Sequence, residues 1–169
     1  IFLFSGLVKG FLGIGLPTAA MAFLTLVMEP TEAISLLTIP IIVTNFFQFT
    51  RSKERLQTAR KYKYFALAIM VSIFITSWNI TAFPTGFLTA AIGLAMVIFS
   101  ANLLFGLLLP IGPGLRWQLG VGVLSGFLGG LSSIWSPPVA MYLMARDTPK
   151  EQFIAATGFL FLAGCFPLA

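Results

Sequence analysis

Charged side chains are scarce in this sequence. Only 9% of its 169 residues are Asp, Glu, Lys or Arg, whereas a soluble domain carries about 25%. In contrast, 58% of the residues are hydrophobic, and the mean hydropathy is +0.99. Apolar runs of about 20 residues, the length at which a helix crosses a bilayer, recur along the chain. The composition therefore predicts an integral membrane protein and excludes an ordinary soluble domain.

Histidine is absent, and cysteine occurs once, as Cys165 within an apolar run. The lack of histidine excludes catalysis by a Ser-His pair, haem ligation by histidine and most zinc sites. Acidic residues occur only outside the apolar runs; they are Glu29, Glu32, Glu54, Asp147 and Glu151. We therefore expect no carboxylate deep in a span that could relay protons or bind sodium. We also expect no enzymatic activity, no metal site and no cofactor.

Five apolar spans and the start of a sixth are predicted. They run roughly over residues 1–28, 34–49, 64–82, 85–109 and 118–145, and the sixth begins near Phe153. The sequence opens on Ile rather than Met and stops within the sixth run, so we expect a fragment of a longer chain. The expected fold class is all-α, a polytopic transmembrane helix bundle in the cell (inner) membrane.

Two segments of the sequence are alike, with the same residue at five of eight positions. Residues 6–13 read GLVKGFLG, and residues 122–129 read GVLSGFLG. Each is followed by a stretch rich in glycine, serine and proline, residues 15–18 in the first and 130–138 in the second. Glycine permits left-handed backbone and proline removes a helix hydrogen bond, so each stretch is expected to break a membrane helix. An internal repeat with broken membrane helices is typical of transporters.

The repeat divides the chain into a first unit of about four spans, residues 1–117, and the incomplete start of a second, residues 118–169. Because four spans separate the starts of the two copies, we expect parallel repeats, both entering the membrane in the same direction. If either break is a re-entrant hairpin rather than a crossing, the count of spans changes, but we expect the two copies to shift together.

Six of the ten basic residues lie between the second and third spans; they are Arg51, Lys53, Arg55, Arg60, Lys61 and Lys63. Short loops rich in Lys and Arg stay in the cytoplasm, so this loop is read as a topology signal rather than as a site for lipid or nucleic acid. Counting spans from it places the N-terminus inside, and residues 29–32 and 146–151 outside.

The two breaks form the expected binding site. In hydrocarbon, unwound backbone persists only where it is buried in protein or lines a cavity. Proline suits the first turn of a helix, so Pro17 and Pro138 are expected to begin half-helices. Their free N–H groups and positive dipole ends would then face a small anion at mid-membrane. The glycines and hydroxyls of the breaks complete this expected site: Gly13, Gly15, Thr18, Gly130, Ser132, Ser133 and Ser136.

Four further candidates each have two interpretations. Lys9 is the one basic residue well inside a span, and it either attracts the anion or extends to the inner membrane face. Trp135 either contacts the anion or fills the gap beside the unwound turn. Asn45 and Gln48, together with Thr44, either line the site or hold neighbouring helices together.

A G-x-x-x-G motif occurs in each copy of the repeat. The two motifs are Gly6-x-x-x-Gly10 and Gly122-x-x-x-Gly126. Small residues at this spacing let helices approach closely, so all four glycines are expected to act mainly in packing.

Several of these features together resemble a known family. They are the paired G-x-x-x-G-F-L-G segments, the breaks that follow them, the Pro-x-Glu sequences at Pro30 and Pro149, and the basic loop. Over its whole length the chain resembles the TauE/SafE sulfite exporter family of bacterial anion transporters. The resemblance implies transport of sulfite, sulfonates or related small organic anions, which agrees with the anion site expected at the breaks. The alternative is a non-transporting membrane scaffold or subunit, and self-association into a homo-oligomer is left open.

Overall fold

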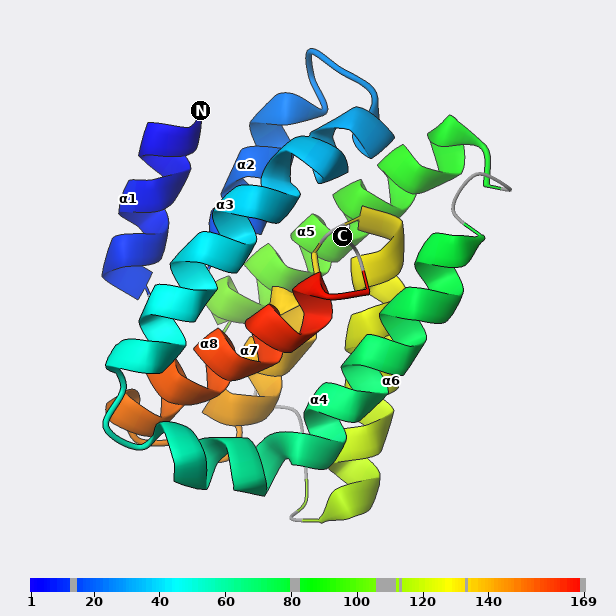
Figure 1. Cartoon of the computed structure of the whole chain (residues 1–169). Helices are drawn as coiled ribbons and strands as arrows, with labels where there is room; N and C mark the ends of the chain where they lie inside the picture. The colour runs from blue at the N-terminus through cyan, green and yellow to red at the C-terminus, as the bar shows by residue number, and fades with distance from the viewer. Residues whose placement is uncertain (13–14, 80–82, 106–111, 113, 133, 168–169) are drawn as a thin grey trace.

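The computed structural model describes residues 1–12, 15–79, 83–105, 112, 114–132 and 134–167. These residues form helices and connecting turns without any strand, which confirms the all-α prediction. In chain order the helices are α1 (Phe2–Leu12), α2 (Leu16–Leu24), α3 (Pro30–Arg51), α4 (Arg55–Trp78), α5 (Thr85–Phe105), α6 (Leu115–Ser132), α7 (Ser136–Met144) and α8 (Lys150–Cys165) (Figure 1).

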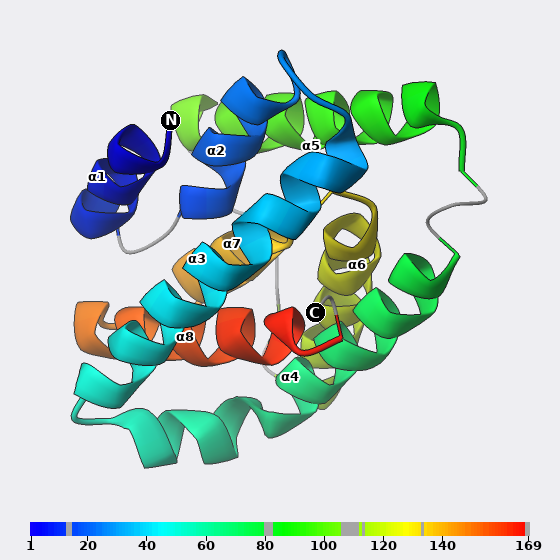
Figure 2. The ribbon, with the colours of Figure 1, turned by 45° about the horizontal axis from the view of Figure 1, so that its top comes forward.

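Both predicted breaks are present, and at each of them the chain turns back on itself (Figures 1 and 2). The rings of Phe4, near the start of α1, and Phe23, near the end of α2, have centroids 5.8 Å apart. Likewise Phe65 of α4 lies beside Gly122, in the first half of α6, and beside Tyr142, near the end of α7. Helices α1 and α2 thus form one hairpin, and α6 and α7 form another. The expectation of broken helices that continue across the membrane is therefore wrong.

Helices α3 and α8 pack together and run in opposite directions (Figures 1 and 2). Gln48, near the end of α3, donates from Nε2 to the Ile154 carbonyl and to Thr157 Oγ1 near the start of α8, both at 2.9 Å. The matched Pro-x-Glu sequences at Pro30 and Pro149 therefore lie at the starts of helices that run in opposite directions. The predicted parallel orientation of the two repeats is wrong. The two hairpins likewise begin at opposite ends of the molecule, α1 at the end that holds the N-terminus and α6 at the other (Figure 1). The division at residues 117 and 118 stays a prediction.

The inversion changes which connections share a side of the molecule. Residues 52–54 and 145–149 lie at the same end, and the N-terminus lies with residues 25–29 at the other end (Figure 1). The placement of residues 146–151 opposite the basic loop is therefore wrong, and so is the placement of the N-terminus beside that loop. The start of α3 lies at the end opposite the basic loop, as expected.

Thiol labelling from each side of the membrane tests this arrangement. In a Cys165→Ala background, Gln57→Cys and Arg146→Cys are expected to react with an impermeant reagent from the same side, because α4 begins where α7 ends. Thr31→Cys, at the start of α3, serves as the matched control and is expected to react only from the other side. Labelling of Gln57→Cys and Arg146→Cys from opposite sides would contradict the inverted arrangement.

The glycines of α6 are packed against α4. A Cβ added to Gly122 would lie 2.8 Å from the Ala68 Cβ, and one added to Gly126 would lie 2.6 Å from the Ser72 Cβ. The packing prediction is confirmed for this motif. At Gly6 and Gly10 an added Cβ would meet nothing within 4 Å. Within the described residues, therefore, the motif in α1 does not pack against another helix.

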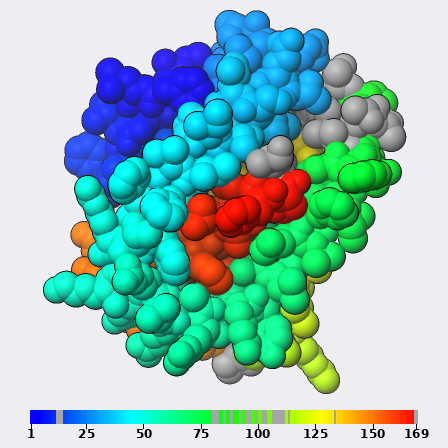
Figure 3. All heavy atoms as spheres, viewed as in Figure 1, coloured from blue at the N-terminus to red at the C-terminus, as the bar shows by residue number. Residues whose placement is uncertain are grey.

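Large apolar side chains cover much of the outer surface. Leu3, Phe11 and Leu26 are 82%, 89% and 78% exposed, an arrangement that suits lipid and is rare on a soluble monomer. Among the described helices, α3 is the one long and apolar enough, by length and composition, to cross a membrane, and residues 2–11 form a shorter apolar helix. In the space-filling view the end of α8 is visible between α3 and α4 (Figure 3).

Candidate functional site

The tips of the two hairpins touch. Helix α2 begins directly after Gly15, whose φ of 96° is in the left-handed region that glycine tolerates. The hydroxyl oxygens of Thr18, in the first turn of α2, and Ser136, at the start of α7, are 3.1 Å apart. Neither helix has a side-chain hydrogen bond that caps its N-terminus. The positive dipole ends of two helices therefore converge at this contact, although Pro17, Pro137 and Pro138 in the first turns have no N–H to donate.

Two serines of α6 satisfy the backbone of the second break. Ser125 Oγ donates to the Trp135 carbonyl at 2.5 Å. Ser132 Oγ donates to the Leu128 carbonyl at 2.6 Å and accepts from the Ile134 N–H at 3.2 Å. These hydroxyls hold the turn between α6 and α7 in place, and the Ser136 hydroxyl is left to face the other hairpin.

Trp135 is 1% exposed and fills the space beside the break. A Cβ on Gly164 would lie 3.0 Å from its Nε1, and one on Gly129 would lie 2.9 Å from its Cβ. Its ring also packs edge-on against Phe161. This packing favours the space-filling interpretation of Trp135. The indole Nε1 nevertheless lacks a hydrogen-bond partner among the described residues.

Lys9 is 7% exposed and is the one charged side chain among the buried residues that the structure describes. Its Nζ donates to Oδ1 of Asn45, which is fully buried and whose Nδ2 has no partner in the described part of the chain. No carboxylate there pairs with Lys9. Its neighbour Val8 approaches the break, since a Cβ on Gly15 would lie 3.5 Å from the Val8 Cγ1. The buried contact with Asn45 favours a site role for Lys9 over extension to the membrane face.

The remaining predicted site residues that the structure describes contact other parts of the molecule. Gly130 lies against α4, where an added Cβ would come within 2.6 Å of the Thr76 Cβ. Gln48 binds α8, and Pro138 lines an apolar cavity of about 560 Å³ between α5, α6 and α7. Pro17 is buried in the first turn of α2. The structure thus brings together Thr18 with Ser136, and Lys9 with Asn45. Two predicted residues lie outside the described part of the chain: Gly13 and Ser133.

Sequence reasoning missed two cations near Lys9. Arg51, at the end of α3, and Lys150, at the start of α8, line a cavity of about 710 Å³ together with Lys9. In the sequence both belong to the polar ends of apolar runs, where a basic residue indicates only topology. No local signal could have found them, because only the opposed directions of α3 and α8 bring them to one cavity.

A helical bundle with an apolar exterior, two opposed half-helix N-termini and a buried cation has the features of a membrane transport protein. The chain matches the sulfite exporter TauE/SafE family over residues 1–168 and belongs to this family. The match confirms the resemblance seen in the sequence and, with it, the class of membrane transporters. Searches of the curated proteins and of the solved structures gave no match.

Proposed function

We propose that the chain moves small sulfur oxyanions, such as sulfite or sulfonates, across the cell membrane, and that the anion binds at the hairpin tips beside Lys9. The observation that carries this proposal is the contact between Thr18 and Ser136, which joins the N-termini of two half-helices from separate hairpins. Membership of the sulfite exporter family supports the class of substrate.

The chemistry of the tips suits an oxyanion. Sulfite and sulfonate groups accept hydrogen bonds through three oxygens. The tips offer the Thr18 and Ser136 hydroxyls and the positive ends of two helices, and Lys9, whose neighbour Val8 faces Gly15 of the first break, offers an ammonium. The Lys9 ammonium has three donors, of which Asn45 takes one, and the Asn45 Nδ2 is a further donor without a partner in the described residues. Because no carboxylate pairs with Lys9 in those residues, the cation is left to attract an anion.

We further propose that transport proceeds by alternating access around the two tips. The hairpins enter from opposite ends of the molecule, so separation of the tips would open a path between them (Figure 2). A non-transporting scaffold would not require two hairpins whose tips meet. Lys9 is a buried cation without a carboxylate partner in the described part of the chain. Such a residue is costly to bury, and in membrane proteins it normally has a function.

Replacement of the buried cation tests the proposal. The change Lys9→Met is expected to weaken sulfite transport about ten- to a hundredfold, the effect of losing a hydrogen bond to a charged ligand. Thermal stability in detergent is expected to change little, because removal of a desolvated charge lowers the cost of burial and offsets the loss of the donor to the buried Asn45 Oδ1. Initial sulfite flux in proteoliposomes and the melting temperature measure the two effects.

The variant Lys9→Arg retains the positive charge and is the matched control, which is expected to keep most of the flux. Normal sulfite flux in Lys9→Met would show that the anion does not depend on this cation. A parallel loss of flux and of melting temperature would instead give Lys9 a structural role.

A further inference from the structure

The cavity beside Lys9 carries positive charge from three different helices. Lys9 comes from α1, Arg51 from α3 and Lys150 from α8, and no acidic residue is among the described residues that line it. Thr44 and Gln48 add polar groups to the α3 wall. The three cations are far apart in the sequence, and the antiparallel packing of α3 and α8 places them around one space.

The cations differ in depth. Arg51 and Lys150 are exposed at the ends of their helices, whereas Lys9 is buried. The Arg51 guanidinium lies over the Phe47 ring, 5.9 Å from its centroid, and this contact holds the charge at the rim. Asn45, which binds Lys9, is six residues before Arg51 on α3, a rise of about 9 Å. Positive charge is therefore present both at the rim of the cavity, on Arg51 and Lys150, and at its buried base, on Lys9.

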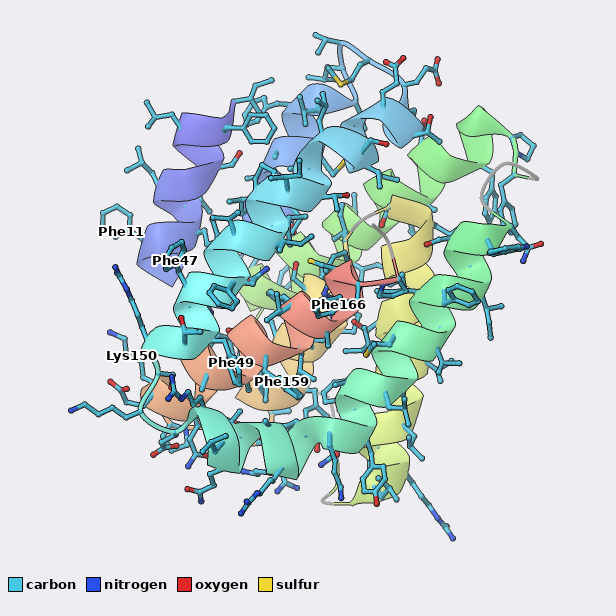
Figure 4. The ribbon with its side chains drawn as sticks, in the orientation of Figure 1. Phe11, Phe47, Phe49, Lys150, Phe159 and Phe166 are labelled. Atoms are coloured by element: carbon cyan, nitrogen blue, oxygen red, sulfur yellow. The ribbon has the colours of Figure 1, made fainter. Side chains whose placement is uncertain are left out.

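Apolar walls strengthen the effect of these charges. Phe11, Phe47 and Phe153 line the same cavity, and Figure 4 shows Phe11 and Phe47 on neighbouring helices at the edge where Lys150 lies. A cleft with charges of one sign and walls of low dielectric concentrates the electric field and raises the local concentration of the opposite ion. The cavity thus has the properties of an entrance for anions.

We propose that Arg51 and Lys150 form the mouth of an access path through which a small oxyanion reaches Lys9 from the side of the loop between α3 and α4. This inference rests on the proposed transport of anions and assigns roles to two residues outside the hairpin tips. Arg51 and Lys150 attract the anion to the mouth of the cavity. The anion then moves to the base of the cavity, where Lys9 binds it.

Transport kinetics provide the first test. Arg51→Gln and Lys150→Gln are each expected to raise the KM for sulfite about two- to twentyfold, the effect of one charge at about 9 Å in surroundings between protein and water. The kcat is expected to be unchanged. At an ionic strength of about 1 M, where the Debye length is about 3 Å, the KM difference is expected to disappear. Lys61→Gln removes an exposed charge on α4 that does not line the cavity, and it is the matched control.

Chemical labelling provides a second test that needs no transport. In a Cys165→Ala background, Gly10→Cys places a thiol on the cavity wall, where an added Cβ meets nothing within 4 Å. For this thiol we compare the rate of reaction with an anionic methanethiosulfonate reagent to the rate with a cationic one. The ratio of these two rates is expected to be severalfold higher than the same ratio for a free thiol in solution. Adding Arg51→Gln and Lys150→Gln is expected to abolish this preference, whereas adding Lys61→Gln is expected to leave it intact.

The outcomes separate the access path from the proposed function. An unchanged KM and an unchanged reagent preference in Arg51→Gln and Lys150→Gln would overturn the access path while sulfite flux persists. A fall in kcat without a change in KM would also overturn it. A protein that carries no sulfite but retains the charge-dependent labelling would overturn the proposed function, because the labelling depends only on the cavity.

Discussion

Oxidation of a protein that carries both Thr18→Cys and Ser136→Cys is expected to stop anion transport completely, and a reductant is expected to restore it. The two native hydroxyl oxygens are 3.1 Å apart, whereas the sulfurs of a disulfide are about 2.05 Å apart, so a small approach of the tips completes the bond. Alternating access requires the two hairpins to separate at this contact. A covalent link between them would therefore hold the protein in one state.

The experiment uses a Cys165→Ala background and measures sulfite flux in proteoliposomes before oxidation, after oxidation and after reduction. Each single cysteine variant is a control, and its flux is expected to be the same before and after oxidation, whatever the effect of losing one hydroxyl at the tips. Formation of the disulfide can be followed by protection of both thiols from alkylation. A linked protein that still transports sulfite at the normal rate would show that the tips need not separate, and alternating access around them would be excluded.

Replacement of Gly126 by leucine is expected to prevent folding. An added Cβ at this position would lie 2.6 Å from the Ser72 Cβ and 2.7 Å from the Ile69 carbonyl oxygen. The second contact involves the backbone of α4, which cannot move aside as a flexible side chain can. Excess methylenes in a packed interior cost about 1–3 kcal/mol even where neighbours can adjust, and the larger leucine would force α4 and α6 apart.

The matched control is Gly120→Leu on the same helix, because an added Cβ there meets nothing within 4 Å. The yield of monodisperse protein in detergent and its melting temperature measure the effect. We expect Gly126→Leu to give little or no folded protein, Gly126→Ala to lower the melting temperature, and Gly120→Leu to resemble the parent. Equal stability of Gly126→Leu and Gly120→Leu would contradict the close packing of α4 and α6.

Local features of the fold could be predicted from the sequence. Proline at Pro17 and Pro138 indicated helix starts, and the structure places both residues in first turns. The break after α6 and the packing of Gly122 and Gly126 also follow from local rules, because each depends on the shape of one or two residues.

The directions of the helices could not be predicted in the same way. A glycine and a proline indicate that the backbone leaves the helix, but the angle at which it continues depends on tertiary contacts such as that between Thr18 and Ser136. An error in this angle is carried forward, because one miscounted crossing inverts every later segment. The structure alone reveals that Lys9 binds Asn45 and lines one cavity with Arg51 and Lys150, because both arrangements depend on the directions of the helices.

Helices α2 and α7 are each nine residues long, and at 1.5 Å per residue each extends about 13 Å from the touching tips toward opposite ends of the molecule. Together they match a hydrocarbon layer of about 30 Å. In the proposed transport cycle only the tips separate the two aqueous sides, so the membrane voltage falls across a few ångströms rather than across the whole layer. Each 100 mV is worth about 2.3 kcal/mol per elementary charge. A charged solute would thus experience nearly all of this energy in the single step at Thr18 and Ser136, and that step alone would make the rate depend on voltage.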